Sequence, residues 1–117
     1  MRRLASLKTW THSKAVAREA YRATLQKPLE RHFGLADQIR SAAVSVPANI
    51  VEGYALGTRP QFVRHIRIAF ASACELSVHI EMARDLDLVP TARANQLLES
   101  CDLLIKLFIG LLKKISP

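Results

Sequence analysis

The sequence predicts an all-α protein, an up-and-down antiparallel four-helix bundle that forms a single domain over residues 1–117. Three observations support this prediction. Four glycines and five prolines are too few for a turn-rich β-sandwich or barrel. In four long segments, apolar residues recur every three or four positions, the spacing of an amphipathic helix. The connections between these segments are short, which makes neighbouring helices antiparallel.

The first helix is expected from about Leu7 to Leu25. Ser6 is the expected N-cap. Lys27-Pro28 ends the segment, because the residue before a proline avoids the α conformation. The apolar face of this helix is moderate and consists of Trp10, Ala17, Ala20, Tyr21 and Thr24.

The second helix is expected from about Leu35 to Ala55, with Gly34 as the break before it. Pro47 lies inside this segment, where it removes one backbone hydrogen bond and is expected to kink the helix near Val46. Two shorter helices that meet at Pro47 are the alternative. One helix is favoured because the apolar period continues in phase through the proline.

The third helix is expected to follow Gly57, with Thr58 or Arg59 as its N-cap and Pro60 in its first turn, and to end near Leu86. Its apolar residues step by three and four throughout, which is typical of a core-facing helix. They are Phe62, Ile66, Ala69, Phe70, Ala73, Leu76, Ile80 and Ala83.

The fourth helix is expected to have Thr91 as its N-cap and to run to about Lys114. Its apolar residues alternate steps of four and three, which is an a/d seam. They are Leu97, Cys101, Leu104, Phe108, Leu111 and Ile115.

Further apolar residues flank this seam, with Leu98 and Ile109 on one side and Leu103 and Leu107 on the other. At 100° per residue the apolar arc becomes about 240° wide, whereas one bundle core needs a stripe of about 100°. These four residues are therefore expected to form the interface of a homo-oligomer. The alternative is a fourth helix that lies deeper within its own bundle.

A line of polar residues follows one face of the second helix. Gln38, Ser45, Asn49 and Glu52 stack there together with Ser41. One interpretation is a solvated stripe. The other is a partly buried hydrogen-bonded seam, within the subunit or between subunits, that fixes the register of the helices because buried polar groups need partners.

The charge is strongly positive and uneven, with a formal net charge of +7. Residues 1–31 hold eight lysines and arginines against two acids, whereas residues 71–117 hold five against six. Such a distribution favours a face that binds nucleic-acid phosphates. Few aromatic residues interrupt it, so contact with the RNA or DNA backbone is expected rather than base stacking. The expected contacts are Lys8, Lys14, Arg18, Arg22 and Lys27 on the first helix, with Arg59, Arg64 and Arg67 as a second cluster that His65 joins if protonated.

The search for catalytic motifs is negative. The four histidines and two cysteines show no zinc-binding spacing, and Glu75 with His79 supplies only half a metal site. Cys74 and Cys101 are expected to be structural thiols. No phosphate-binding loop, nucleophile elbow or dinucleotide fingerprint occurs. The sequence therefore predicts no enzyme, no cofactor and no metal.

The most apolar run, Leu103 to Leu112, is interrupted by Lys106 and reaches about half a membrane span. No apolar signal segment follows the N-terminus. The expected location is the cytoplasm, with no membrane partner.

The stretch GLADQIRSAAVSVPANIVEG, residues 34–53, resembles the signature of small bacterial four-helix-bundle proteins associated with 23S rRNA intervening sequences. The similarity continues in Phe62, Ile68-Ala69, Ser72 and Glu75-Leu76, and more loosely in residues 7–10 and Tyr21. Two positions depart from the family pattern, which usually has a basic residue at Ser41 and a glycine at Ala71.

The resemblance implies an up-and-down bundle that assembles as a ring-shaped homopentamer. It also implies kinship with the accessory variability protein of diversity-generating retroelements, a basic pentamer that binds nucleic acid and partners a reverse transcriptase. The expected function is a non-catalytic, homo-oligomeric and pentameric bundle that binds RNA or DNA electrostatically with little base specificity. The alternative is a protein-interaction scaffold or an accessory subunit for a nucleic-acid enzyme such as a reverse transcriptase.

Overall fold

The computed structural model describes Leu4 and residues 7–117, so the expected N-cap Ser6 lies outside the described residues. The described chain contains four long α-helices and one short 3-10 helix, and no strand occurs in these residues. The elements are α2 (Lys8–Ala23), η1 (Leu29–Arg31), α3 (Phe33–Leu56), α4 (Arg59–Asp85) and α5 (Thr91–Ile115). The all-α bundle predicted from the sequence is confirmed.

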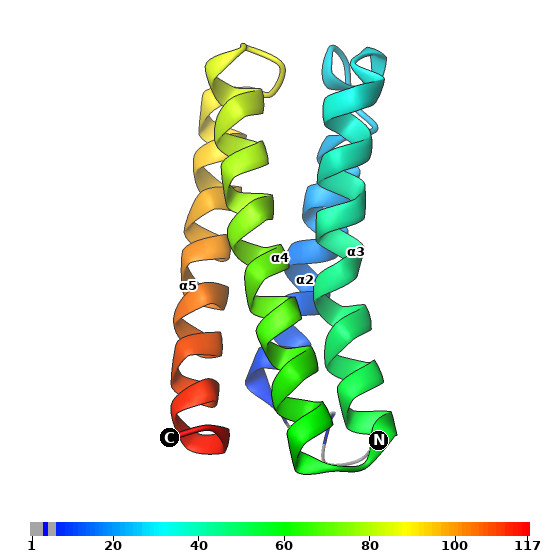
Figure 1. Ribbon diagram of the computed structural model, residues 1–117. Helices are drawn as coiled ribbons and strands as arrows, with labels where there is room; N and C mark the ends of the chain where they lie inside the picture. Colours follow the sequence, from blue (N-terminus) through cyan, green and yellow to red (C-terminus); the bar gives the residue numbers. More distant parts are fainter. Residues whose placement is uncertain (1–3, 5–6) are drawn as a thin grey trace.

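The helices run antiparallel in a four-cornered bundle of 43 × 21 × 21 Å (Figure 1). Each helix packs against its neighbours in the order α2, α3, α4, α5 and back to α2, so α2 and α4 occupy opposite corners. The turn between α3 and α4 lies at the same end of the bundle as the C-terminus (Figure 1). The η1 segment and the turn between α4 and α5 lie at the other end.

The core forms where the apolar stripes of the helices meet. Each helix contributes small or branched side chains, and Phe108 of α5 is the largest that is fully buried. Its ring lies 6.2 Å from that of Phe70 on α4, centroid to centroid, at an interplanar angle of 53°. Such tilted pairs add to the stability gained from burial alone. The a/d seam of α5 is buried at Leu97, Cys101, Leu104 and Phe108 and half-buried at Leu111 and Ile115.

The predicted helix ends fall within two residues of those in the structure, and one predicted cap is confirmed. The Thr58 hydroxyl accepts a hydrogen bond from the backbone N–H of Gln61 at the start of α4. Pro60 lies in the first turn of that helix. Gly57 ends α3 with a φ of 81°, a left-handed conformation that glycine adopts without a steric cost.

Two boundary predictions are wrong. Gly34 is not a break, because α3 already begins at Phe33; the first N–H groups of a helix lack intrahelical partners, so a glycine there interrupts no hydrogen bond. Thr91 is not the N-cap of α5. Pro90 holds that position in an extended conformation, and its carbonyl accepts the first helical bond from Ala94 at 2.9 Å.

Helix α3 continues through Pro47 as a single element, so the alternative of two shorter helices is wrong. The helix also approaches α4 closely at Gly53. A Cβ atom at Gly53 would lie 2.7 Å from the Cβ of His65 and 3.4 Å from backbone atoms of Phe62. Real Cβ atoms do not approach one another this closely, so the packing of α3 on α4 depends on this glycine.

Both cysteines are free. Burial, together with the smaller effect of the neighbouring Asp102 carboxylate, raises the pKa of the Cys101 thiol to about 12. Burial also raises the pKa of Cys74. Thiolate formation, which cysteine reactivity requires, is therefore disfavoured at both positions.

Candidate nucleic-acid interface

The basic residues predicted on the first helix lie on the outer face of α2. This helix buries Val16, Ala17 and Ala20 against the bundle, so the opposite face with Lys14, Arg18 and Arg22 is exposed. Lys8, at the start of α2, and Lys27, beyond its end, are also exposed.

Two of these cations have an acidic partner. The Glu19 carboxylate accepts a hydrogen bond from Arg22 Nη1 at 3.0 Å and lies 3.9 Å from Arg18 Nε. All three side chains are solvent-exposed, and exposed pairs of this kind contribute little to stability. The Lys14 ammonium lies 5.0 Å from the centre of the Trp10 ring, a cation–π contact. Glu19 therefore reduces the positive charge of α2 in its second half more than at its start.

The second predicted cluster lies at the start of α4 and is bonded to the end of α5. Arg59 donates from Nε to the carbonyl oxygen of Ile115 at 3.1 Å and from Nη2 to that of Lys114 at 3.4 Å. Arg67 Nη2 donates to Ser116 Oγ at 3.0 Å. Arg64 is exposed on the same helix. The carbonyls at a helix C-terminus lack intrahelical donors, so Arg59 satisfies groups that would otherwise face water.

The structure brings a third group of cations to this end of the bundle. Lys106, Lys113 and Lys114 are exposed on the last turns of α5. We define the basic end as the seven cations of residues 8–12, 53–67 and 106–117, segments that contain no aspartate or glutamate. They are Lys8, Arg59, Arg64, Arg67, Lys106, Lys113 and Lys114.

The three α5 lysines were not among the cations predicted from the sequence to contact nucleic acid. The signal was present, because an antiparallel bundle places the end of the fourth helix beside the starts of the first and third. None of the seven cations forms an ion pair with a carboxylate in the part of the chain that the structure describes. This end therefore carries a concentration of positive charge that no described ion pair neutralises.

The predicted polar seam lies partly buried between α3 and α4, within the subunit. Ser45 Oγ lies 2.8 Å from Ser72 Oγ, and Asn49 Nδ2 donates to the Ser45 carbonyl and hydroxyl at 2.9 and 3.0 Å. Asn49 Oδ1 lies 3.0 Å from His65 Nδ1. The partners on α4, Ser72 and His65, were not identified from the sequence, which placed His65 among the basic residues.

The ends of the seam differ from its centre. Glu52 is exposed and lies 3.9 Å from His65 Nδ1. Gln38 and Ser41 are exposed and take no part in this network. The solvated interpretation thus describes these outer positions, whereas Ser45 and Asn49 form hydrogen bonds across the helix pair. The Asn49–His65 contact holds the α4 histidine beside Gly53, where the two backbones come closest.

The four residues predicted for an oligomer interface lie on two different flanks of α5. Leu103 and Leu107 line a hollow beside α2, whereas Leu98 and Ile109 follow the side on which Asn95 bonds to Arg84 of α4. Leu98 and Leu107 are half-buried within the subunit, while Leu103 remains 49% and Ile109 42% exposed.

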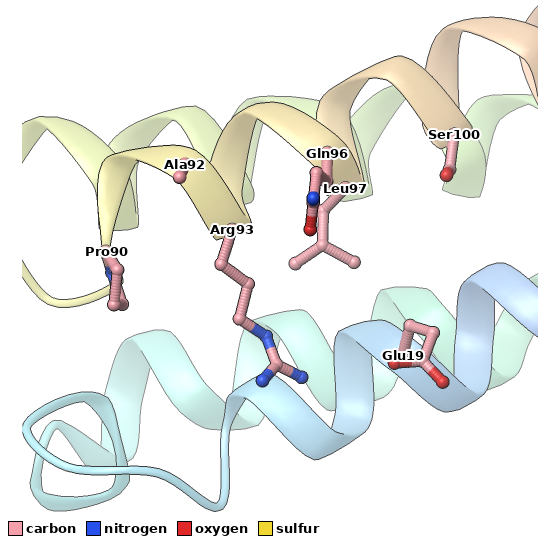
Figure 2. Close-up of a pocket in the computed structure, with 7 residues that line it drawn as sticks. All are labelled: Glu19, Pro90, Ala92, Arg93, Gln96, Leu97 and Ser100. Carbon is pink, nitrogen blue, oxygen red and sulfur yellow. The ribbon is translucent and has the colours of Figure 1, made fainter.

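A hollow of about 600 Å³ lies between α2 and α5 toward the other end of the bundle (Figure 2). Arg93 extends from α5 toward α2, and Glu19 lies on the α2 side. Glu19 is already paired with Arg22, and no nucleophile in the described hollow lies within hydrogen-bond distance of a base. Glu75 and His79 are 3.1 Å apart, but no group of three metal-ligating side chains occurs among the described residues.

A helical bundle with a concentration of cations at one end belongs to the class of small basic bundle proteins. The chain is a member of the 23S rRNA-intervening sequence protein family, whose family model matches residues 5–110. The resemblance drawn from residues 34–53 is therefore confirmed.

A solved structure has the same fold. It is described as a protein with unknown function from the S23 ribosomal protein family from Bacteroides thetaiotaomicron VPI-5482. The two share 20% sequence identity and superpose with a TM-score of 0.81 over 90% of this chain and 98% of that one. No curated protein matches the chain. In the described part of the chain, no helix combines the length and the apolar character that crossing a membrane requires.

Proposed function

We propose that the protein is a non-catalytic, homo-oligomeric bundle that binds RNA or DNA through its phosphate backbone, with little base specificity. The observation that carries this proposal is the basic end, where three segments far apart in sequence contribute seven cations and no acid. A cation cluster without acidic partners attracts a polyanion, because the cations release the counterions condensed on its phosphates. The family's association with an intervening sequence of 23S rRNA is consistent with this class of ligand.

The exposed cations extend along the surface of the bundle beyond the basic end. From the basic end, the exposed face of α2 continues through Lys14, Arg18 and Arg22. Arginine binds phosphate oxygens with two parallel hydrogen bonds, whereas lysine acts as a compact point charge. Among the described residues, the exposed tyrosine and phenylalanine side chains are Tyr21, near the end of α2, and Phe33, at the start of α3, both away from the basic end. Recognition through charge and backbone shape is therefore favoured over stacking on bases.

The proposal includes self-association, pentameric as in the family resemblance, through the exposed apolar residues of α5. Leu103 and Ile109 are each about half exposed in the subunit. Their burial against further copies would contribute a favourable apolar term. Assembly would also bring several basic ends into one particle, so that weak contacts at each subunit add up to a high avidity.

The first test is the salt dependence of binding. The affinity for a fluorescent duplex DNA is expected to fall by about 10³-fold between 50 and 200 mM salt, as for proteins with six or more phosphate contacts. Fluorescence anisotropy measures this change. Duplexes of unrelated sequence should bind within about threefold of one another, since the proposed contacts read no base edges. An affinity that hardly changes with salt, or a strong preference for one sequence, would refute the phosphate-contact mechanism.

A further inference from the structure

The basic end contains a hollow of about 350 Å³ between the start of α2 and the last turns of α5. Three lysines line it, Lys8 from α2 and Lys106 and Lys114 from α5, together with Leu107, Gly110 and Leu111. No acidic side chain lines this hollow. The volume is at the small end of the range of ligand sites. We infer that this hollow, here called the lysine hollow, binds a phosphate group whose oxygens accept hydrogen bonds from the three ammonium groups.

The spacing of the α5 residues supports this inference. Lys106, Gly110 and Lys114 follow one another at intervals of four, so they lie in a row along the helix. The two lysines are about 12 Å apart along the helix axis, and each has a flexible four-carbon stem. Gly110 lies midway, and a Cβ atom there would meet nothing within 4 Å. The middle of the row is thus open to a group that both lysines can reach.

The N-terminus of α2 increases the positive potential of the hollow. Leu7 and Lys8 place the N-terminus of α2, the positive end of its dipole, beside the hollow. No acidic residue occupies the first turn of α2, and among the described residues no side chain caps it. The C-terminus of α5 would oppose this effect, but Arg59 donates to the carbonyls of Lys114 and Ile115 and so reduces the exposed negative charge.

Apolar side chains complete the site. Leu107 and Leu111 form part of its wall, which lowers the local dielectric constant and strengthens the attraction between a phosphate and the lysines. Without an anion, the three ammonium groups repel one another. This inference rests on the proposed function, because it identifies where a backbone phosphate would bind; a small phosphate ligand would present the same chemistry.

The first arm of the test uses inorganic pyrophosphate and the ¹⁵N-labelled full chain. Titration is expected to shift the backbone amide signal of Gly110 in a saturable way. The signal of Gly34, which is exposed on α3 at the opposite end of the bundle, should not move. The double variant K106Q/K114Q should lose the Gly110 shift. The double variant R31Q/R93Q removes the same charge from η1 and the start of α5, at the opposite end of the bundle, and should retain it.

The second arm measures single-stranded RNA binding by fluorescence anisotropy. K106Q/K114Q is expected to weaken binding at least tenfold and to reduce the log–log salt slope by about 0.7, the contribution of the one phosphate of a single strand that the hollow binds. R31Q/R93Q, which lies outside the basic end and outside the cation stripe of α2, should weaken binding less than threefold. The variant G110L keeps every charge but fills the hollow. It should therefore weaken the binding of both pyrophosphate and RNA. Thermal unfolding of each variant establishes that it is folded.

The two arms separate the possible failures. If RNA binds and both double variants weaken it equally, the lysine hollow is refuted while the proposed function stands. If pyrophosphate leaves Gly110 unmoved, the hollow is also refuted. If pyrophosphate shifts Gly110 and K106Q/K114Q abolishes the shift, but no nucleic acid binds, the hollow is supported as a site for a small phosphate compound and the proposed function fails.

Discussion

Replacing Phe108 with alanine is expected to lower the free energy of unfolding by about 3–5 kcal/mol, the usual cost of removing a large aromatic side chain from a core. Phe108 is fully buried in the seam of α5 and contacts the ring of Phe70 on α4. The substitution removes apolar burial, the ring contact and the packing of the surrounding side chains. A bundle this small has few other core layers to compensate for the loss.

Urea denaturation followed by circular dichroism measures this change. Val78→Ala is the matched control, because Val78 lies on α4 and is 58% exposed. It should change the stability by no more than about 0.5 kcal/mol, as for other surface positions. An equal loss of unfolding free energy in the two variants would contradict the burial of Phe108 in the core.

Replacing Gly53 with alanine is expected to destabilise the protein by about 1–3 kcal/mol, the range for overpacking a close contact. One added methyl group would lie 2.7 Å from the Cβ of His65. A Cβ atom cannot move away by rotating its side chain, so α3 and α4 must shift apart. That shift would also strain the Asn49–His65 and Ser45–Ser72 hydrogen bonds between these helices.

Gly110→Ala is the matched control for this second prediction, since it makes the same chemical change in another helix. Space is open around Gly110, and alanine has the higher helix propensity, so this variant should be stabilised by about 0.5–1 kcal/mol. Thermal and urea unfolding of the pair measure the contrast. If the Gly53→Ala variant is as stable as the Gly110→Ala variant, this result would contradict the close packing of α3 against α4 at Gly53.

The helices could be predicted from the sequence because their spacing is regular over many turns. Helix α4 shows this most clearly, since its apolar steps and its Thr58 cap agree with the structure. The errors at Gly34 and Thr91 concern single boundary residues. A boundary depends on which carbonyl accepts the first helical bond, and at α5 that carbonyl belongs to a proline that lacks a donor but can still accept.

The candidate site could be predicted only in part. The stripe of Lys14, Arg18 and Arg22 is visible because the residues are local in sequence. The lysines at the end of α5 were overlooked, although the antiparallel topology implies their position, because residues 71–117 as a whole carry more acids than bases. Similarly, Ser45 and Asn49 share a face by spacing alone, but their partners Ser72 and His65 depend on the register of α4 against α3. Contacts between segments that are distant in sequence could be identified only from the three-dimensional structure.

One measurement tests the central claim that the protein is an oligomeric, phosphate-binding polycation. Light scattering and the ratio of absorbance at 260 and 280 nm are recorded on the same chromatographic peak of the purified protein. The predicted result is a particle with a mass several times that of the 13.1 kDa chain, five times for a pentamer. It should carry nucleic acid at low salt and lose it at high salt. A particle of 13.1 kDa without nucleic acid at low salt would contradict the claim.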